Sequence, residues 1–149
     1  KADVNSIAHA HPMYGKTFST LGKMLDPISQ DSCAFYERTA IFADYDGVAN
    51  GPDEGINIAK ALGDKEFCIL QNHGILTTGS MVDTAVWYFL NMEDACKSQL
   101  LAEAVGEPKI IPHETACATR DYVANDLSAY VSFQPTIDVL WEEEPDLLD

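Results

Sequence analysis

The sequence of 149 residues predicts an α/β domain, and two observations carry this prediction. Segments with the period of a strand alternate along the chain with segments of helical period. One apolar segment, residues 66–71, has the length of a strand but almost no polar alternation, which is typical of a central strand covered on both faces. A chain of this length can bury a core of its own.

Composition narrows the class of protein. A hydrophobic share of 46% indicates a globular chain, and a formal net charge of -15 argues against nucleic-acid and anionic-membrane partners, which require clustered Lys and Arg. We find no apolar run of the ~20 residues that a membrane span requires, and no signal-peptide pattern. The four cysteines Cys33, Cys68, Cys96 and Cys117 are widely spaced, so we expect free thiols and a cytoplasmic protein.

The first third of the chain is punctuated by Pro and Gly. Each change of period coincides with one of these residues or with a polar cluster. The predicted elements are a strand ending at Pro12, a helix over 13–21 that stops at Gly22, a short strand or extended stretch over 25–29, a polar turn or helix start over 30–32 and a strand over 39–43.

The next segments alternate in the same way. The predicted elements are a helix with Asp53 as its N-cap that ends at Gly63, the central strand over 66–71, an antiparallel return over 75–78 and a long helix over 82–104 that ends at Gly106. The apolar residues expected to face the core from the long helix are Val82, Ala85, Val86, Phe89, Leu90, Cys96 and Leu100.

The last forty residues have a different character. Pro108 and Pro112 mark a connector, and residues 115–125 are predicted to form one more helix. The end of the chain is acidic, and we expect a surface arm that contacts a neighbouring subunit through aromatic side chains. Those side chains are Tyr130, Phe133 and Trp141.

Two histidines stand two residues apart in the first strand. Residues i and i+2 of a strand point to the same face, so His9 and His11 can converge on one point, and Pro12 ends the strand there. His73 follows the central strand and precedes Gly74, where the backbone can turn tightly. Three imidazoles leave a position open on a divalent ion, as in catalytic metal sites. Two core histidines with satisfied hydrogen bonds would give the same spacing.

Four short motifs carry a resemblance to a known family: His-Ala-His at 9–11, Tyr-Gly-Lys at 14–16, Ser-Gln-Asp-Ser-Cys-Ala-Phe-Tyr at 29–36 and Gln-Asn-His-Gly at 71–74. In this order they resemble the class II aldolase/adducin family, and in particular its fungal adducin-like branch. The resemblance covers essentially the whole chain but only the C-terminal part of the family's domain. It implies a three-layer α/β/α fold with a mixed, mostly antiparallel sheet that lacks its N-terminal part.

The resemblance also implies a metal centre. His9, His11 and His73 match the family's three metal-binding histidines, and the ion is a divalent metal, most often zinc. In the aldolases and epimerases of the family this ion stabilises the enediolate formed when a carbon–carbon bond breaks. Residues 1–107 would then be the metal-binding part of the domain, and residues 108–149 a connector, a helix and an acidic arm.

Other residues are candidates for contacts with the substrate. Gln30, Asp31 and Lys16 are candidate substrate-binding residues, and Tyr36 is a candidate proton donor. A turn or surface role is the simpler alternative for each, while Tyr14 is expected to pack and His113 to be an ordinary surface residue. The family's anion-binding loops and its acidic proton acceptor precede the His-Ala-His strand, and the chain starts at Lys1 within three residues of it. We therefore expect a truncated chain without its general base.

These inferences favour a metal-dependent lyase of the aldolase type. Its substrate would be a small hydroxy-carbonyl or carboxylate compound, cleaved through an enediolate or enolate. A decarboxylase or an epimerase on the same metal centre is an alternative, and so is a non-catalytic adducin-like binding or assembly module. The resemblance implies a homo-oligomer, a tetramer in most members. The truncated chain itself is then expected to be inactive.

Overall fold

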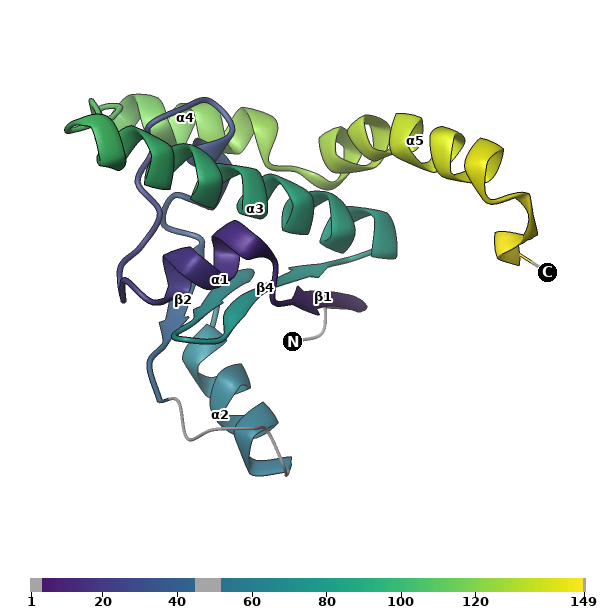
Figure 1. The fold of residues 1–149 in the computed structure, drawn as a ribbon, viewed down its shortest axis with the longest axis horizontal. Coiled ribbons are helices and arrows are strands. Elements are labelled where there is room, and N and C mark those ends of the chain that lie inside the picture. The colour runs from purple at the N-terminus through teal and green to yellow at the C-terminus, as the bar shows by residue number, and fades with distance from the viewer. Residues whose placement is uncertain (1–3, 45–51, 149) are drawn as a thin grey trace.

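The computed structural model describes residues 4–44 and 52–148 (Figure 1). Its strands are β1 Ser6–Ala10, β2 Thr39–Phe42, β3 Phe67–Leu70 and β4 Gly74–Gly79. Its α-helices are α1 Met13–Ser19, α2 Pro52–Leu62, α3 Val82–Val105, α4 His113–Val123 and α5 Asp126–Glu143. Two short 3-10 helices, η1 Ser32–Phe35 and η2 Pro145–Leu148, complete the described elements.

The four strands form one mixed sheet in the order β1-β4-β3-β2. β1 pairs with β4 and β4 with β3 in antiparallel fashion, while β2 runs parallel to β3. Helices α1 and α3 lie over one face, and α2 lies on the opposite side (Figure 1). The three-layer α/β/α architecture with a mostly antiparallel sheet is therefore confirmed.

Strand β3 is the central strand that its apolar sequence predicts, because all four of its residues are buried. Phe67 and Ile69 join the core beneath α1 and α3. Cys68 and Leu70 point to the other face, where residues of α2 such as Ile58 pack on them. A strand apolar on both faces is stable only between two layers of helix.

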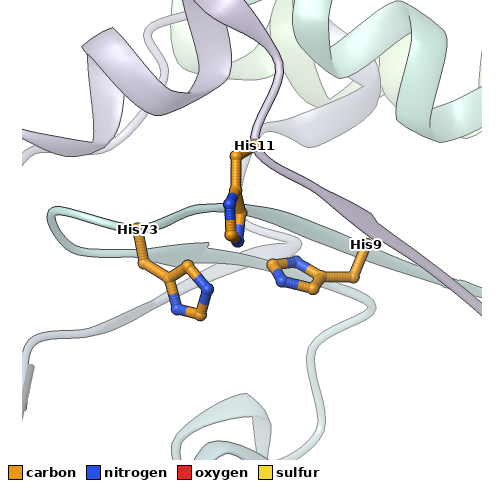
Figure 2. A group of neighbouring side chains, drawn as sticks. All are labelled: His9, His11 and His73. Carbon is orange, nitrogen blue, oxygen red and sulfur yellow. The ribbon is translucent and has the colours of Figure 1, made fainter. Parts of the chain in front are cut away.

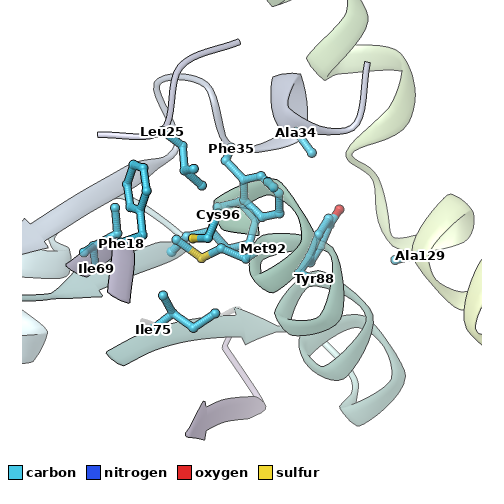
Figure 3. Packing of buried hydrophobic residues seen from close by; sticks show 12 residues of the cluster. Phe18, Leu25, Ala34, Phe35, Ile69, Ile75, Tyr88, Met92, Cys96 and Ala129 are labelled. Atoms are coloured by element: carbon cyan, nitrogen blue, oxygen red, sulfur yellow. The ribbon is translucent and has the colours of Figure 1, made fainter. Parts of the chain in front are cut away.

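Helix α3 packs on the sheet through a face that matches the predicted one only in part: Ala85 and Cys96 are buried, and Phe89 and Leu100 pack against the core. Met92 and Cys96 lie at its centre with Phe18, Phe35 and Tyr88 around them (Figure 3). The buried residues of the helix are Thr84, Ala85, Tyr88, Met92, Ala95, Cys96 and Gln99. Val82 and Leu90, which were predicted to face the core, are 67% and 44% exposed.

The cause of this error is that polar residues occupy core positions of the helix. Gln99 is fully buried, and its side chain accepts from the backbone N–H of Asp26 at 2.8 Å and donates to the Asp26 carboxylate at 2.7 Å. Thr84 is also buried, although its hydroxyl has no hydrogen-bond partner among the described residues. Counting apolar residues alone therefore misses the positions of the buried face that polar residues occupy.

Two local predictions need comment. Of the two alternatives for residues 25–29, the strand is absent, because the Ser32 hydroxyl accepts from the backbone N–H groups of Ile28 and Ser29 and turns the chain into η1. Helix α2 begins at Pro52, so Asp53 lies inside its first turn instead of capping it. Pro is well suited to the first turn of a helix, where its missing N–H would have no partner in any case.

The predicted acidic arm contains a helix, α5, that packs against α3. Its Phe133 is buried within this chain, whereas Tyr130 and Trp141 are 42% and 51% exposed. The Asn125 side chain caps the helix by accepting from the backbone N–H of Ser128. The division of the chain at residue 107 stays a prediction. Within the described residues, no helix has the length and apolar character that crossing a bilayer requires.

The packing of α3 gives a test of the fold. Met92→Ala should lower the free energy of unfolding by about 2–5 kcal/mol, since the fully buried side chain leaves a cavity. Leu101→Ala on the same helix, where the side chain is 56% exposed, should change it by no more than about 0.5 kcal/mol. Chemical denaturation of both variants measures the difference, and equal effects would contradict this packing.

Candidate metal centre

Three imidazoles converge at one end of the sheet (Figure 2). His9 lies on β1, His11 directly follows that strand, and His73 lies in the turn between β3 and β4. Their ring centroids are 5.2 Å apart for His9 and His11, 5.0 Å for His9 and His73, and 4.5 Å for His11 and His73. One nitrogen from each ring lies within 4.8 Å of the other two. The two-residue spacing of His9 and His11 and the position of His73 after the buried strand β3 thus bring the three imidazoles together, as predicted.

The pairing of β1 with β4 creates this convergence. His9 is opposite Leu76, which packs in the core cluster on the α2 side of the sheet, so His9 projects to that side as well. At the end of the ladder the backbone of Gly74 approaches β1 closely. A Cβ atom there would lie 2.5 Å from the carbonyl oxygen of Ala10 and 3.2 Å from Cδ2 of His11. Only glycine fits at this contact.

A hydrogen bond sets the tautomer of His9. Its Nδ1 lies 2.9 Å from the carbonyl oxygen of Ile75, which can only accept, so Nδ1 carries the proton. The lone pair of Nε2 is therefore free to bind a cation. Metal-binding histidines commonly use their second nitrogen in this way, which fixes both the tautomer and the ring orientation.

The surroundings of His73 favour its neutral form. Burial lowers the pKa of His73, and the nearby His9 and His11 lower it further, while Glu54 on α2 acts in the opposite direction. A lowered pKa keeps His73 unprotonated near neutral pH, which is the form that binds metals. Glu54 is a carboxylate on the site's side of the molecule that the sequence reading missed, because nothing in the sequence links α2 to His73.

Glu93 on α3 fixes the segment that carries His11. The backbone N–H groups of Tyr14 and Gly15 donate to its two carboxylate oxygens at 2.9 and 2.5 Å. Pro12 precedes α1 and offers no side-chain cap, so Glu93 satisfies the open N–H groups of the first turn. The sequence reading missed this contact as well, since Glu93 is almost eighty residues away along the chain from its partners.

The remaining predicted site residues lie elsewhere in this chain. Tyr36 hydrogen-bonds to His113 of α4, with 3.1 Å between its hydroxyl oxygen and Nδ1. Gln30 and Asp31 are exposed and line two hollows beside α4, the Asp31 hollow having a volume of about 230 Å³. Lys16 is exposed on α1. The roles in substrate binding and proton transfer proposed for these four residues stay predictions.

Tyr14 and His113 complete the comparison with the sequence reading. Tyr14 is half-buried and packs against the main core, as predicted. His113 is exposed, but it has close partners in Tyr36 and Cys117 instead of being an isolated surface residue.

Comparison with known proteins identifies the fold and this site's family. Residues 1–100 match the family described as "Class II Aldolase and Adducin N-terminal domain". The chain belongs to the class II aldolase/adducin family. The motifs around the three imidazoles pointed to the same family.

Two curated relatives align with nearly the whole chain. The decarboxylase NovR of Streptomyces niveus is 37% identical over 147 residues, which are 99% of this chain and 54% of NovR. The meiotically up-regulated gene 14 protein of Schizosaccharomyces pombe is 40% identical over 138 residues, 91% of this chain and 54% of that protein. The chain thus spans about half the length of these relatives.

A solved structure has the same fold. The L-fuculose 1-phosphate aldolase from Glaciozyma antarctica PI12 superposes with a TM-score of 0.89 at 38% identity, over 98% of this chain and 55% of that one. Class II aldolases generally depend on a divalent metal, and the three imidazoles are the candidate ligands here. Imidazole nitrogens suit a borderline divalent ion, and the tautomer of His9 leaves its Nε2 free to bind one.

The contact at Gly74 makes a sharp prediction. Gly74→Ala should weaken the binding of Co²⁺ or Zn²⁺ by about 10–100-fold, because the new Cβ atom displaces Ala10 and His11. Titration with the metal ion, followed by absorption or calorimetry, measures this. Gly55→Ala is the matched control, because a Cβ atom there meets nothing within 4 Å. Unchanged affinity in Gly74→Ala would show that the site does not depend on this contact.

The capping role of Glu93 can be tested separately. Glu93→Ala should lower the free energy of unfolding by about 1–2 kcal/mol, because two N–H groups of α1 lose their acceptor. It should also weaken metal binding, since α1 starts two residues after His11. Asp94→Ala, which removes an exposed carboxylate from the next position of α3, should change neither quantity.

Proposed function

We propose that this chain forms the metal-binding part of a lyase that cleaves a carbon–carbon bond next to a carbonyl group, with aldol cleavage as the leading reaction. The observation that carries the proposal is the cluster of His9, His11 and His73, in which the Nδ1 proton of His9 is already committed to Ile75. The likeness to an L-fuculose 1-phosphate aldolase at 38% identity supports the same class of reaction.

In this proposal the residues of this chain hold the metal ion and orient its ligands. His9, His11 and His73 bind a divalent ion, most reasonably zinc, through neutral nitrogens. A divalent ion in such a site supplies Lewis-acid stabilisation of negative charge that develops on a substrate oxygen. The hydrogen bond to Ile75 holds the His9 ring, and the Glu93 cap holds the segment after His11, so little reorganisation is needed when substrate binds.

The proposed substrate is a small hydroxy-carbonyl or carboxylate compound. His9 and His11 are exposed and His73 is half-buried, so a small molecule can reach the open side of the ligand set. Adjacent hydroxyl and carbonyl oxygens would chelate an ion there, which orients the bond to be broken.

Decarboxylation is the second candidate reaction. Its support is the 37% identity to the decarboxylase NovR over 99% of the chain. In a 3-oxo acid, CO₂ leaves from the carbon next to the carbonyl, and the electron pair of the broken bond moves to the carbonyl oxygen as it does in aldol cleavage, so one metal centre suits both. The two reactions differ in product: a second carbonyl compound in one case and CO₂ in the other.

Metal content is the first test. His73→Ala should remove one ligand and lower the affinity of the site for the divalent ion by more than about 100-fold. Substitution of residues that only hydrogen-bond to metal ligands already lowers metal affinity by about 10–100-fold. Elemental analysis and metal titration measure the metal content and the affinity. Asp138→Asn on the exposed surface of α5 is the control and should bind as the unmodified protein does.

Activity is the second test. The test uses this chain within a protein of the full length of its relatives. Stripped by a chelator and reloaded with zinc, that protein should cleave L-fuculose 1-phosphate or release CO₂ from a 3-oxo acid, and without metal it should do neither. If His73→Ala kept full metal content, the assignment of the ligands would be wrong. If metal bound but no carbonyl compound or CO₂ was formed by the complete protein, the reaction class would be wrong.

A further inference from the structure

A second cluster of ligand-type side chains lies beside α4. Glu37 follows η1, while His113 and Cys117 stand four positions apart on α4 and therefore on one face of that helix. One ligand atom of each residue lies within 4.8 Å of those of the other two. Glu37 and His113 are exposed and Cys117 is half-buried, so an ion can reach the cluster from solvent.

The distances in this cluster are close to those of a coordinated ion. Bond lengths of about 2.0–2.3 Å at tetrahedral angles place the ligand atoms of zinc about 3.3–3.6 Å apart. Here Cys117 Sγ lies 3.8 Å from Glu37 Oε2 and 3.8 Å from His113 Nε2. The sulfur is therefore only a few tenths of an ångström farther from its two neighbours than it would be around a bound ion.

Two neighbours orient the cluster. The Tyr36 hydroxyl lies 3.1 Å from Nδ1 of His113, and in the tautomer where Nδ1 donates to it, the Nε2 lone pair is free. Nη1 of Arg120 donates to Oε2 of Glu37 at 3.3 Å and to the backbone oxygen of Tyr36 at 3.4 Å, which holds the carboxylate toward α4. The arginine leaves Oε1 of Glu37 available, at 3.7 Å from the imidazole of His113.

The donor set selects a class of ion. A thiolate, an imidazole and a carboxylate suit a borderline divalent ion of the zinc type better than Mg²⁺ or Ca²⁺, which prefer oxygen ligands. Cys117 and Glu37 supply two negative charges when deprotonated. These charges offset those of the divalent ion, which would bind close to the positive charge of Arg120.

We propose that Glu37, His113 and Cys117 form a second divalent-metal site, separate from the three imidazoles. An ion there would join the segment after η1 to α4 across more than seventy residues of chain, and its fourth position would face solvent. The proposal does not depend on the proposed lyase activity, because it uses none of the ligands His9, His11 and His73.

Cobalt titration under reducing, oxygen-free conditions tests the proposal, because a thiolate ligand adds a sulfur-to-cobalt charge-transfer band that imidazoles alone do not give. The unmodified protein should bind two equivalents of Co²⁺ and show this band. Cys117→Ala should bind one equivalent and lose the band. His73→Ala should bind one equivalent and keep it. The other three cysteines are buried, so they do not compete for the ion.

Glu37→Gln provides a second variant, which retains the thiol. It should weaken Co²⁺ binding at this site, measured from the charge-transfer band, at least tenfold. The proposal is overturned if the unmodified protein shows no charge-transfer band, or if the band persists in Cys117→Ala. In the first case Tyr36, His113 and Arg120 form a hydrogen-bonded surface cluster only. One equivalent with the band in the unmodified protein would support this site while contradicting the three-histidine site, so the two ideas fail separately.

Discussion

The close approach of Gly74 to the end of β1 is the contact on which the candidate metal centre depends. Strand pairing alone would place His9 near β4, but it would not bring the turn that carries His73 against His11. The absence of a side chain at Gly74 allows the carbonyl of Ala10 to lie where a Cβ atom would stand. Because Gly74 has no Cβ atom, the end of β1 and the start of β4 can approach closely enough for His11 and His73 to lie side by side.

Long-range contacts hold the layers together at the other end of β3, away from this site. Arg38 forms a two-pronged ion pair with Glu66 at the starts of β2 and β3, and its Nη1 donates to the carbonyl of Ala124 at 2.9 Å. Burial works against the charge of Arg38, but the hydrogen bonds and charge of Glu66 outweigh it and raise the pKa of the guanidinium. Such a pair contributes specificity, because removing one partner leaves the other charge partly buried.

The features that sequence reasoning found are those with a local signature. The two-residue spacing of His9 and His11 fixes a common side through strand geometry, and the apolar segment ending at Leu70 identifies the central strand that brings in His73. Family resemblance added the order of the layers. The sheet and the imidazole cluster were therefore accessible before any coordinates.

The features that it missed involve partners far apart in the chain or polar residues inside the core. Glu93 caps α1, which lies almost eighty residues earlier in the chain, and no local sequence pattern predicts such a contact. Gln99 occupies a core position that an apolar count passes over, whereas Leu90, which such a count assigns to the core, is 44% exposed. The segment after Asn125 contains Pro135, which argues against a continuous helix, yet α5 forms through it and packs on α3 with Ala129 and Phe133 buried.

The hydrogen bond from His9 to the carbonyl of Ile75 links the chemistry of the site to the folding of the sheet. If β1 paired one residue out of register, every side chain on the strand would move to the opposite face, and His9 would point beneath α3. A divalent ion added during refolding would therefore be captured only by molecules whose edge strand has joined correctly. Metal binding would thus report whether β1 has paired in the native register. A design that transfers the three histidines to another protein must also reproduce this strand register.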